Sequence, residues 1–250
     1  MRAADHTAPE ELPLNGERTL PGIWHENYWF RRHEIAYAAI VPHVRGAKVL
    51  DVGCGEGYGS AMLADHAAQV IALDYDPLTV AHAHRQYPSL AVVSGNAVTL
   101  PVTDGSVDAV VALQVVEHLW DQQAFVRECA RVLRPGGRAW LSTPNRLTFS
   151  PGRDTPRNPC HTRELAPDEL AVLLAARFAV ERLLGVHHGR RLTAWERNHG
   201  AIVDAQLGAE PGTWPAAVRD TVAGIRADDF ELRDDDPALS LDVLAVATRQ

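Results

Sequence analysis

Short apolar runs alternate along most of this chain with longer stretches in which apolar residues recur every three or four positions. The short runs predict buried strands, and the longer stretches predict amphipathic helices. Strands interleaved with helices indicate an α/β fold, with a seven-stranded, mostly parallel sheet and helices on both of its faces. We expect the strands at residues 48–52, 69–74, 90–94, 107–113, 138–143, 178–184 and 241–248.

One domain accounts for nearly the whole chain. Residues 1–22 are polar, contain three prolines and show no periodicity, so we expect a flexible N-terminal segment. Residues 23–250 then form a single domain, with a helical segment at 23–45 and an insertion at 185–240 before the last strand. The helix at 23–45 either covers an edge of the sheet or, with its aromatic and basic side chains, forms a lid over the site.

The composition limits the classes of function. The 250 residues carry a net charge of −8, so the broad positive surface of a nucleic-acid-binding protein is missing and no nucleic-acid partner is expected. A bilayer span needs about 20 apolar residues and none is found, nor does the N-terminus look like a signal peptide. We therefore expect a cytoplasmic protein without membrane insertion. The three cysteines show neither a disulfide framework nor metal-ligand spacing.

The stretch that follows the first strand gives the strongest functional signal. Four glycines stand there at alternate positions, Gly53, Gly55, Gly57 and Gly59. Glycines permit a tight turn and leave the main chain open to a ligand, and the helix that follows favours an anionic group at its N-terminus. A dinucleotide-binding turn has glycines at the first, third and sixth positions, but the sixth position here is Tyr58. Asp51, two residues before the first glycine, is placed to hold a positively charged amino group.

This pattern, Asp-x-Gly-x-Gly-x-Gly, resembles the signature of the class I S-adenosylmethionine-dependent methyltransferases. The resemblance implies a Rossmann-like class I methyltransferase fold and S-adenosyl-L-methionine as cofactor. Asp74 ends the second strand, where a carboxylate can accept both hydroxyls of a ribose. Asn96 follows the third strand, where the family often has an acid that contacts the adenine amino group, and its amide oxygen can accept the same hydrogen bond.

The segment after the fourth strand supplies the first catalytic candidate. Glu117 and His118 follow residues 107–113, and ligands bind beyond the carboxyl ends of strands in such sheets. A neutral histidine can accept the proton of an acceptor hydroxyl, which typically adds ~10²- to 10⁴-fold to the rate. Alternatively, both residues only open and orient the next helix.

Residues 144–163 form a long irregular stretch, which in a compact domain is usually functional or disordered. Its four arginines and His161 suit a polar or anionic substrate such as a sugar or a sugar acid. The alternative is a solvated surface loop. His187 and His188 are paired, but neither a cysteine nor a carboxylate stands at ligand spacing, so no metal is expected.

Longer motifs extend the resemblance over most of the chain. They are Glu26–His33, Glu117–Asp121, Ser142–Arg146, Phe149–Thr155, His161–Leu165 and Ile202–Gln206. Together they resemble actinobacterial methyltransferases assigned to O-methylation of glucose units in 6-O-methylglucose lipopolysaccharide. This resemblance implies methyl transfer to a sugar hydroxyl of a glucan or a glucosylglycerate-type precursor.

We therefore predict three groups of site residues. The catalytic candidates are His118, His161 and His33. The cofactor candidates are Asp51, Gly53, Cys54, Gly55, Gly57, Asp74, Tyr75, Asn96, Ala97 and Gln114. The substrate candidates are Tyr28, Arg32, Arg146, Arg153 and His187.

Other functions remain open at this point. The acceptor could be another small molecule, such as a natural-product scaffold, or the chain could bind the cofactor without catalysis, because folds tolerate lost chemistry. A nicotinamide dehydrogenase is disfavoured by the glycine spacing. The oligomeric state is not indicated by the sequence.

Overall fold

The computed structural model describes Leu12 and residues 18–250. Most of the predicted flexible segment, residues 1–22, therefore lies outside the described residues. Arg18 and Thr19 fall within the segment predicted to be flexible, yet they pack against the domain: Thr19 is buried, and Arg18 lies 3.2 Å from the carboxylate of Asp76.

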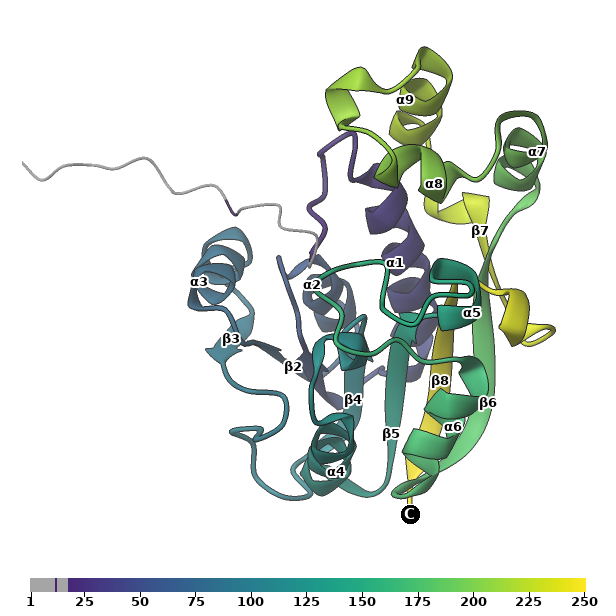
Figure 1. Cartoon of the computed structure of the whole chain (residues 1–250). Coiled ribbons are helices and arrows are strands. Elements are labelled where there is room, and N and C mark those ends of the chain that lie inside the picture. Colours follow the sequence, from purple (N-terminus) through teal and green to yellow (C-terminus); the bar gives the residue numbers. More distant parts are fainter. Residues whose placement is uncertain (1–11, 13–17) are drawn as a thin grey trace, which may run out of the picture.

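A mixed sheet of eight strands runs through the molecule in the order β3-β2-β1-β4-β5-β8-β6-β7 (Figure 1). The first five strands in this order pair in parallel, whereas β8 is antiparallel to β5 and β6, and β7 is antiparallel to β6. The strands are β1 (Lys48–Val52), β2 (Gln69–Asp74), β3 (Ala91–Ser94), β4 (Val107–Leu113), β5 (Leu133–Pro144), β6 (Phe178–His188), β7 (Phe230–Arg233) and β8 (Asp242–Arg249).

The eighth strand corrects the predicted number of seven. Strand β7 lies within the segment 185–240 that we expected as an insertion, and it pairs with Gly185–His188 at the end of β6. Strand β6 thus continues to His188, beyond its predicted end at Leu184. A strand of four residues contains too few alternations of apolar and polar positions to be recognised by periodicity.

Helices cover both faces of the sheet, as predicted. Successive side chains of a strand point to opposite faces, so in β1 Val49 packs in a cluster with α1 and α2, while Leu50 packs in a second cluster with α4 and α6. The longer helices are α1 (Asn27–Ile40), α2 (Tyr58–Ala64), α3 (Pro77–Gln86), α4 (Gln122–Val132), α6 (Pro167–Ala175), α7 (Arg190–His199), α8 (Ile202–Leu207) and α9 (Ala216–Ala223). No helix in the described part of the chain is long and apolar enough to cross a membrane.

A third apolar cluster joins α1 to the segment before the last strand. Tyr28 is fully buried there with Trp214 and Phe230, and Trp195 packs against the same cluster. Figure 1 shows α7, α8 and α9 gathered beyond one end of the sheet, beside α1. Both tryptophans therefore serve packing, and α1 is held between the sheet and the segment 185–240.

Candidate active site

The glycine turn after β1 has the left-handed backbone that favours glycine. The φ angles are +71° at Gly53, +54° at Gly55 and +103° at Gly57. A Cβ atom added at Gly53 would lie 2.5 Å from Cγ2 of Val115, whereas one added at Gly55 would meet nothing within 4 Å. The turn is therefore tightly packed at its first glycine and open at its second.

A cavity of about 630 Å³ opens at this turn, beyond the carboxyl ends of β1, β2 and β4. Seven of the ten predicted cofactor residues line it, namely Gly53, Gly55, Asp74, Tyr75, Asn96, Ala97 and Gln114. Two large aromatic side chains on its wall, Tyr75 and Trp120, are 76% and 92% exposed. An open glycine turn, a carboxylate and exposed aromatic faces together fit an adenosyl ligand.

The polar side chains of this cavity are already oriented by the main chain. Asp74 accepts hydrogen bonds from the N–H groups of Gly55 at 2.9 Å and Asp76 at 3.0 Å, one on each carboxylate oxygen. Asn96 accepts one from the N–H of Val98 at 3.0 Å, on the amide oxygen that we assigned to the adenine amino group. An amide oxygen has two lone pairs, so one remains for a ligand.

Asp51, Cys54 and Gly57 do not line this cavity, although we predicted all three as cofactor residues. Asp51 is fully buried behind the turn and accepts hydrogen bonds from Ser60 at 2.5 Å and Tyr37 at 3.3 Å. Burial raises the pKa of Asp51 to about 7. These two hydrogen bonds connect the end of β1, just before the turn, to helices α1 and α2.

A second cavity, of about 560 Å³, adjoins the first. Both are lined by Arg18, Gln114 and His118, so these side chains form the wall that the two cavities share. Gln114 has an unusual φ of +58° and is fixed to Ser142 by two hydrogen bonds of 3.0 Å, one from its main chain and one from its side chain. The end of β4 is therefore held rigidly between the cavities.

All three predicted catalytic histidines line the second cavity. The rings of His118 and His161 are nearly perpendicular, with centroids 4.9 Å apart. Nδ1 of His118 lies 3.1 Å from the carbonyl oxygen of Cys160, and Nδ1 of His161 lies 2.7 Å from a carboxylate oxygen of Glu164. His33, on α1, is half-buried in the wall of the cavity, and desolvation lowers its pKa to about 4.

The main chain of Glu117 brings the long loop to this cavity. The N–H groups of Thr162 and Arg163 donate to the Glu117 carbonyl oxygen at 2.7 and 3.2 Å. The Glu117 side chain is completely buried and also lines the second cavity, and burial raises its pKa to about 8. Part of the loop 144–163 is therefore a wall of the site, and a short helix, α5 (Arg146–Phe149), forms within it.

Four of the five predicted substrate residues lie away from both cavities. They are Tyr28, Arg146, Arg153 and His187. Tyr28 is buried against His188, with its hydroxyl 2.9 Å from Nε2. Arg146 pairs with Glu169 at 3.0 Å, Arg153 is exposed, and His187 is buried in β6. Only Arg32 lines the second cavity, so the geometry gives no support to substrate contacts by the other four.

Comparison with known proteins decides the family. A family model described as a methyltransferase domain matches residues 50–141. A protein of Mycolicibacterium smegmatis, named as a probable S-adenosylmethionine-dependent methyltransferase, is 52% identical over the full length of both chains. A Mycobacterium tuberculosis protein with the same description is 49% identical and covers 99% of this chain and 93% of its own. This chain belongs to the S-adenosylmethionine-dependent methyltransferases.

Solved structures agree with the methyltransferase fold. An S-adenosylmethionine-dependent methyltransferase of Mesorhizobium loti matches with a TM-score of 0.55 at 19% identity, covering 87% of this chain and 98% of its own. The [4+2]-cyclase SpnF matches with a TM-score of 0.60 at 22% identity, covering 88% of this chain and 80% of its own. Since a cyclase shares the fold, the fold alone does not identify an acceptor.

The methyltransferase site contains residues that the sequence did not single out. They are Arg18, Trp29, Asn158 and Trp120. Trp120 stands two residues after His118, and Trp29 and Asn158 lie in the helix 23–45 and the loop 144–163, two segments that we expected near the site, whereas Arg18 lies in the predicted flexible segment. Only the folded chain brings these segments together.

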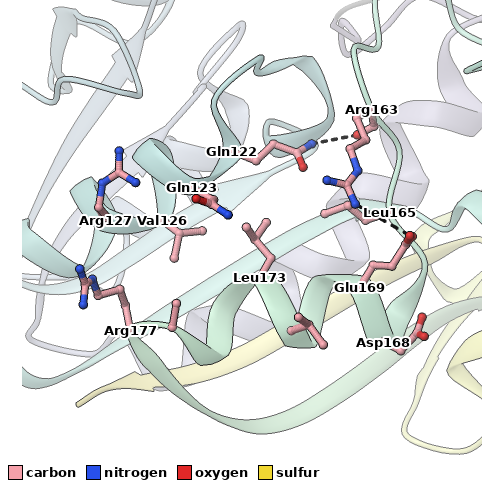
Figure 2. Close-up of a pocket in the computed structure, with 12 residues that line it drawn as sticks. Gln122, Gln123, Val126, Arg127, Arg163, Leu165, Asp168, Glu169, Leu173 and Arg177 are labelled. Carbon is pink, nitrogen blue, oxygen red and sulfur yellow. Dashed lines mark hydrogen bonds and ion pairs between the residues drawn. The ribbon is translucent and has the colours of Figure 1, made fainter.

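A further hollow lies between α4 and α6 of the methyltransferase (Figure 2). Its floor includes Val126 and Leu173, and Arg127, Arg163 and Arg177 stand at its rim. None of the predicted site residues lines it, and it shares no residue with the two adjoining cavities. We assign it no role in the reaction.

Proposed function

We propose that this methyltransferase transfers the methyl group of S-adenosyl-L-methionine to a sugar hydroxyl, in a glucan or a glucosylglycerate-type precursor of methylglucose lipopolysaccharide. The observation that carries the proposal is the shared wall: Gln114 and His118 line both cavities. Donor and acceptor bound in adjoining cavities would meet at these side chains. Holding the two reactants in one orientation supplies much of the acceleration in such a reaction.

The cofactor cavity provides the donor half of the site. The bound cofactor supplies a methyl group that is already activated for displacement. Asp74 would accept the ribose hydroxyls, Asn96 would accept the adenine amino group, and the open turn at Gly55 would leave room for the ligand against the main chain. Asp51 would stabilise the turn from behind, through Ser60 and Tyr37.

The second cavity provides the acceptor half. An acceptor hydroxyl has to lose a proton, and His118 and His161 are the side chains that we expect to act on it, with His33 third. The lowered pKa of His33 makes it a weak base, because a general base works best with a pKa near the working pH. The ring of Trp29, together with Arg32 and Asn158, supplies the mixture of aromatic and polar surface that suits a sugar.

Oxygen as the acceptor atom has independent support. A ubiquinone biosynthesis O-methyltransferase of Xanthomonas oryzae is 36% identical over 166 residues, covering 61% of this chain and 62% of its own. The sugar itself is supported by the lining of the second cavity and by the motifs Ser142–Arg146 and His161–Leu165.

A transfer assay with labelled S-adenosyl-L-methionine tests the proposal. The acceptors are short α-glucans, sugar acids of the glucosylglycerate type and a panel of unrelated alcohols, after calorimetry has confirmed cofactor binding. We expect label on a glucose hydroxyl, and much weaker cofactor binding for Asp74→Asn. Transfer to an unrelated alcohol but to none of the sugars would overturn the choice of acceptor, and cofactor binding without any transfer would argue against catalysis.

A further inference from the structure

Three side chains in the acceptor cavity lie close enough together to share one ligand. Glu117, His118 and His161 each offer one ligand atom, and these three atoms all lie within 4.8 Å of one another. The sequence did not reveal this cluster, because His161 comes from a loop more than forty residues after the other two. Metal sites are often built in this way, from a short local pair and one distant ligand.

The side chain of Glu117 also favours a bound cation. It is completely buried, and among the described residues neither of its oxygens has a hydrogen bond of normal geometry, although the hydroxyl of Thr143 is close enough to act on its pKa. No described basic residue forms a salt bridge with it either. A buried carboxyl group without a hydrogen-bond partner is costly, whereas coordination of a cation by its carboxylate form would satisfy it.

The two imidazoles are held in the orientation that metal ligands require. A carbonyl oxygen can only accept a hydrogen bond, so the Cys160 carbonyl fixes the proton of neutral His118 on Nδ1. Glu164 does the same for His161 at 2.7 Å. In both neutral rings the lone pair is then on Nε2, although Nε2 of His161 lies 3.2 Å from the side-chain amide nitrogen of Asn158, which would have to give way to an ion. A ligand histidine usually has such a carbonyl or carboxylate behind it.

We propose that Glu117, His118 and His161 bind a divalent metal ion in the acceptor cavity. Two imidazoles and one carboxylate favour borderline cations such as Zn²⁺ or Co²⁺ over Mg²⁺, which prefers oxygen ligands. Bonds of about 2.1 Å in a tetrahedral site separate ligand atoms by about 3.4 Å, so the three side chains close slightly on binding. Three protein ligands leave coordination positions open towards the cavity.

The role of the ion rests on the proposed function. An open coordination position facing the acceptor cavity would bind a sugar hydroxyl, fix its orientation and lower its pKa. His118 and His161 would then act as ligands in place of the general-base role proposed above, and the proton of the coordinated hydroxyl would pass to solvent water. This distinguishes the metal site from general-base catalysis by the same two residues.

Metal binding is measured on the untagged, full-length protein after treatment with a chelator. Titration with Co²⁺ is followed by the visible absorption of the ion, and titration with Zn²⁺ by calorimetry, both without cofactor or sugar. We expect one ion per chain. Glu164→Gln should weaken binding by about 10- to 100-fold, as the loss of a hydrogen-bond partner behind a ligand does, and Glu117→Gln and His161→Ala should weaken it more.

His33→Gln is the matched control, because His33 lines the same cavity outside the cluster, and it should bind the ion as the parent does. The parent's own titration decides the question even if a variant fails to fold. Absence of a bound ion in the parent, or parental affinity in both Glu117→Gln and His161→Ala, would overturn the metal site. If sugar methylation persists in the presence of a chelator and without a bound ion, the proposed function stands and the proposed metal site is wrong. A bound ion without sugar methylation would leave the metal site standing and overturn the sugar as acceptor.

Discussion

Arg32 and Asp242 form a buried ion pair that joins helix α1 to the last strand, β8. Both side chains are only 2% exposed, and Nε of Arg32 donates to Asp242 at 2.5 Å while Nη2 donates to the Leu241 carbonyl oxygen at 2.9 Å. The remaining nitrogen, Nη1, has no hydrogen-bond partner among the described residues, and Arg32 lines the acceptor cavity. One arginine thus holds the scaffold together and forms part of the site.

Arg32→Met should destabilise the protein strongly. It leaves the Asp242 carboxylate buried without its partner, which typically lowers the free energy of unfolding by about 3–5 kcal/mol. Urea denaturation measures the loss. Arg31→Met is the control on the same helix, since Arg31 is half-exposed and its ion pair with Glu34 is worth about 1 kcal/mol or less. Equal losses in the two variants would contradict a structural role for the buried pair.

The first two glycines of the turn should respond differently to alanine. In Gly53→Ala the left-handed backbone costs about 1–2 kcal/mol, and the clash with Val115 adds about 1–3 kcal/mol of overpacking. In Gly55→Ala only the backbone term applies, because the added Cβ meets no atom. Urea denaturation of both variants tests this order. A Gly55→Ala protein less stable than Gly53→Ala would show that the packing of the turn is not as described.

The carboxylate of Asp51 should make stability depend on pH. Burial raises its pKa from 3.8 to about 7, so between these values the folded protein holds the proton more tightly than the unfolded chain does. The stability that this group contributes is complete below about pH 4 and is lost as the pH rises to about 7.

We therefore expect Asp51→Asn to gain stability relative to the parent as the pH rises from 4 to 8. The full difference is on the order of 4 kcal/mol, from 1.36 kcal/mol for each unit of pKa. Urea denaturation at pH 4, 6 and 8, without cofactor, measures it. Asp65→Asn, on the exposed end of α2, is the control for the substitution itself. A parent and an Asp51→Asn variant that change in parallel with pH would refute the raised pKa.

Trp120 should contribute to cofactor binding. It is 92% exposed yet lines the cofactor cavity, which is unusual for a large aromatic side chain unless a ligand covers it. Stacking of a base on an aromatic ring contributes about 1–3 kcal/mol, so Trp120→Ala should weaken S-adenosyl-L-methionine binding by about 5- to 150-fold. Calorimetry measures the affinity. Trp24→Ala, which alters a tryptophan outside both cavities, should leave it unchanged.

The fold and the donor half of the site could be predicted because their signals are local. The apolar runs of β1, β2 and β4 are buried on both faces, and their predicted bounds match the structure. The glycine turn directly follows β1, and Asp74 is the last residue of β2. The alternating side chains of a parallel strand and the conformational needs of a tight turn depend on neighbouring residues, which a sequence shows directly.

The acceptor half could be predicted only in part, because its contacts join distant segments. His118 and His161 were candidates as separate residues, but the hydrogen bonds from the loop to Glu117 are what bring them together. Arg146 and Arg153 were assigned to substrate by their charge alone, and charge does not say which way a side chain points. The sequence did not predict a role for Glu117 separate from that of His118, because an acid next to a histidine is common. The burial of Glu117 is visible only in the folded chain.

The wall shared by the two cavities has a consequence for how the acceptor range of this enzyme could change. Gln114, in that wall, is fixed to Ser142 on the neighbouring strand, so its position is set by the sheet and not by any loop. Apart from Arg18, the donor side is built from residues 52–121, while much of the acceptor side comes from 18–33 and 144–161. Exchange between relatives of the segments that line the acceptor cavity would therefore change the substrate that receives the methyl group, while the residues of the cofactor cavity stay the same.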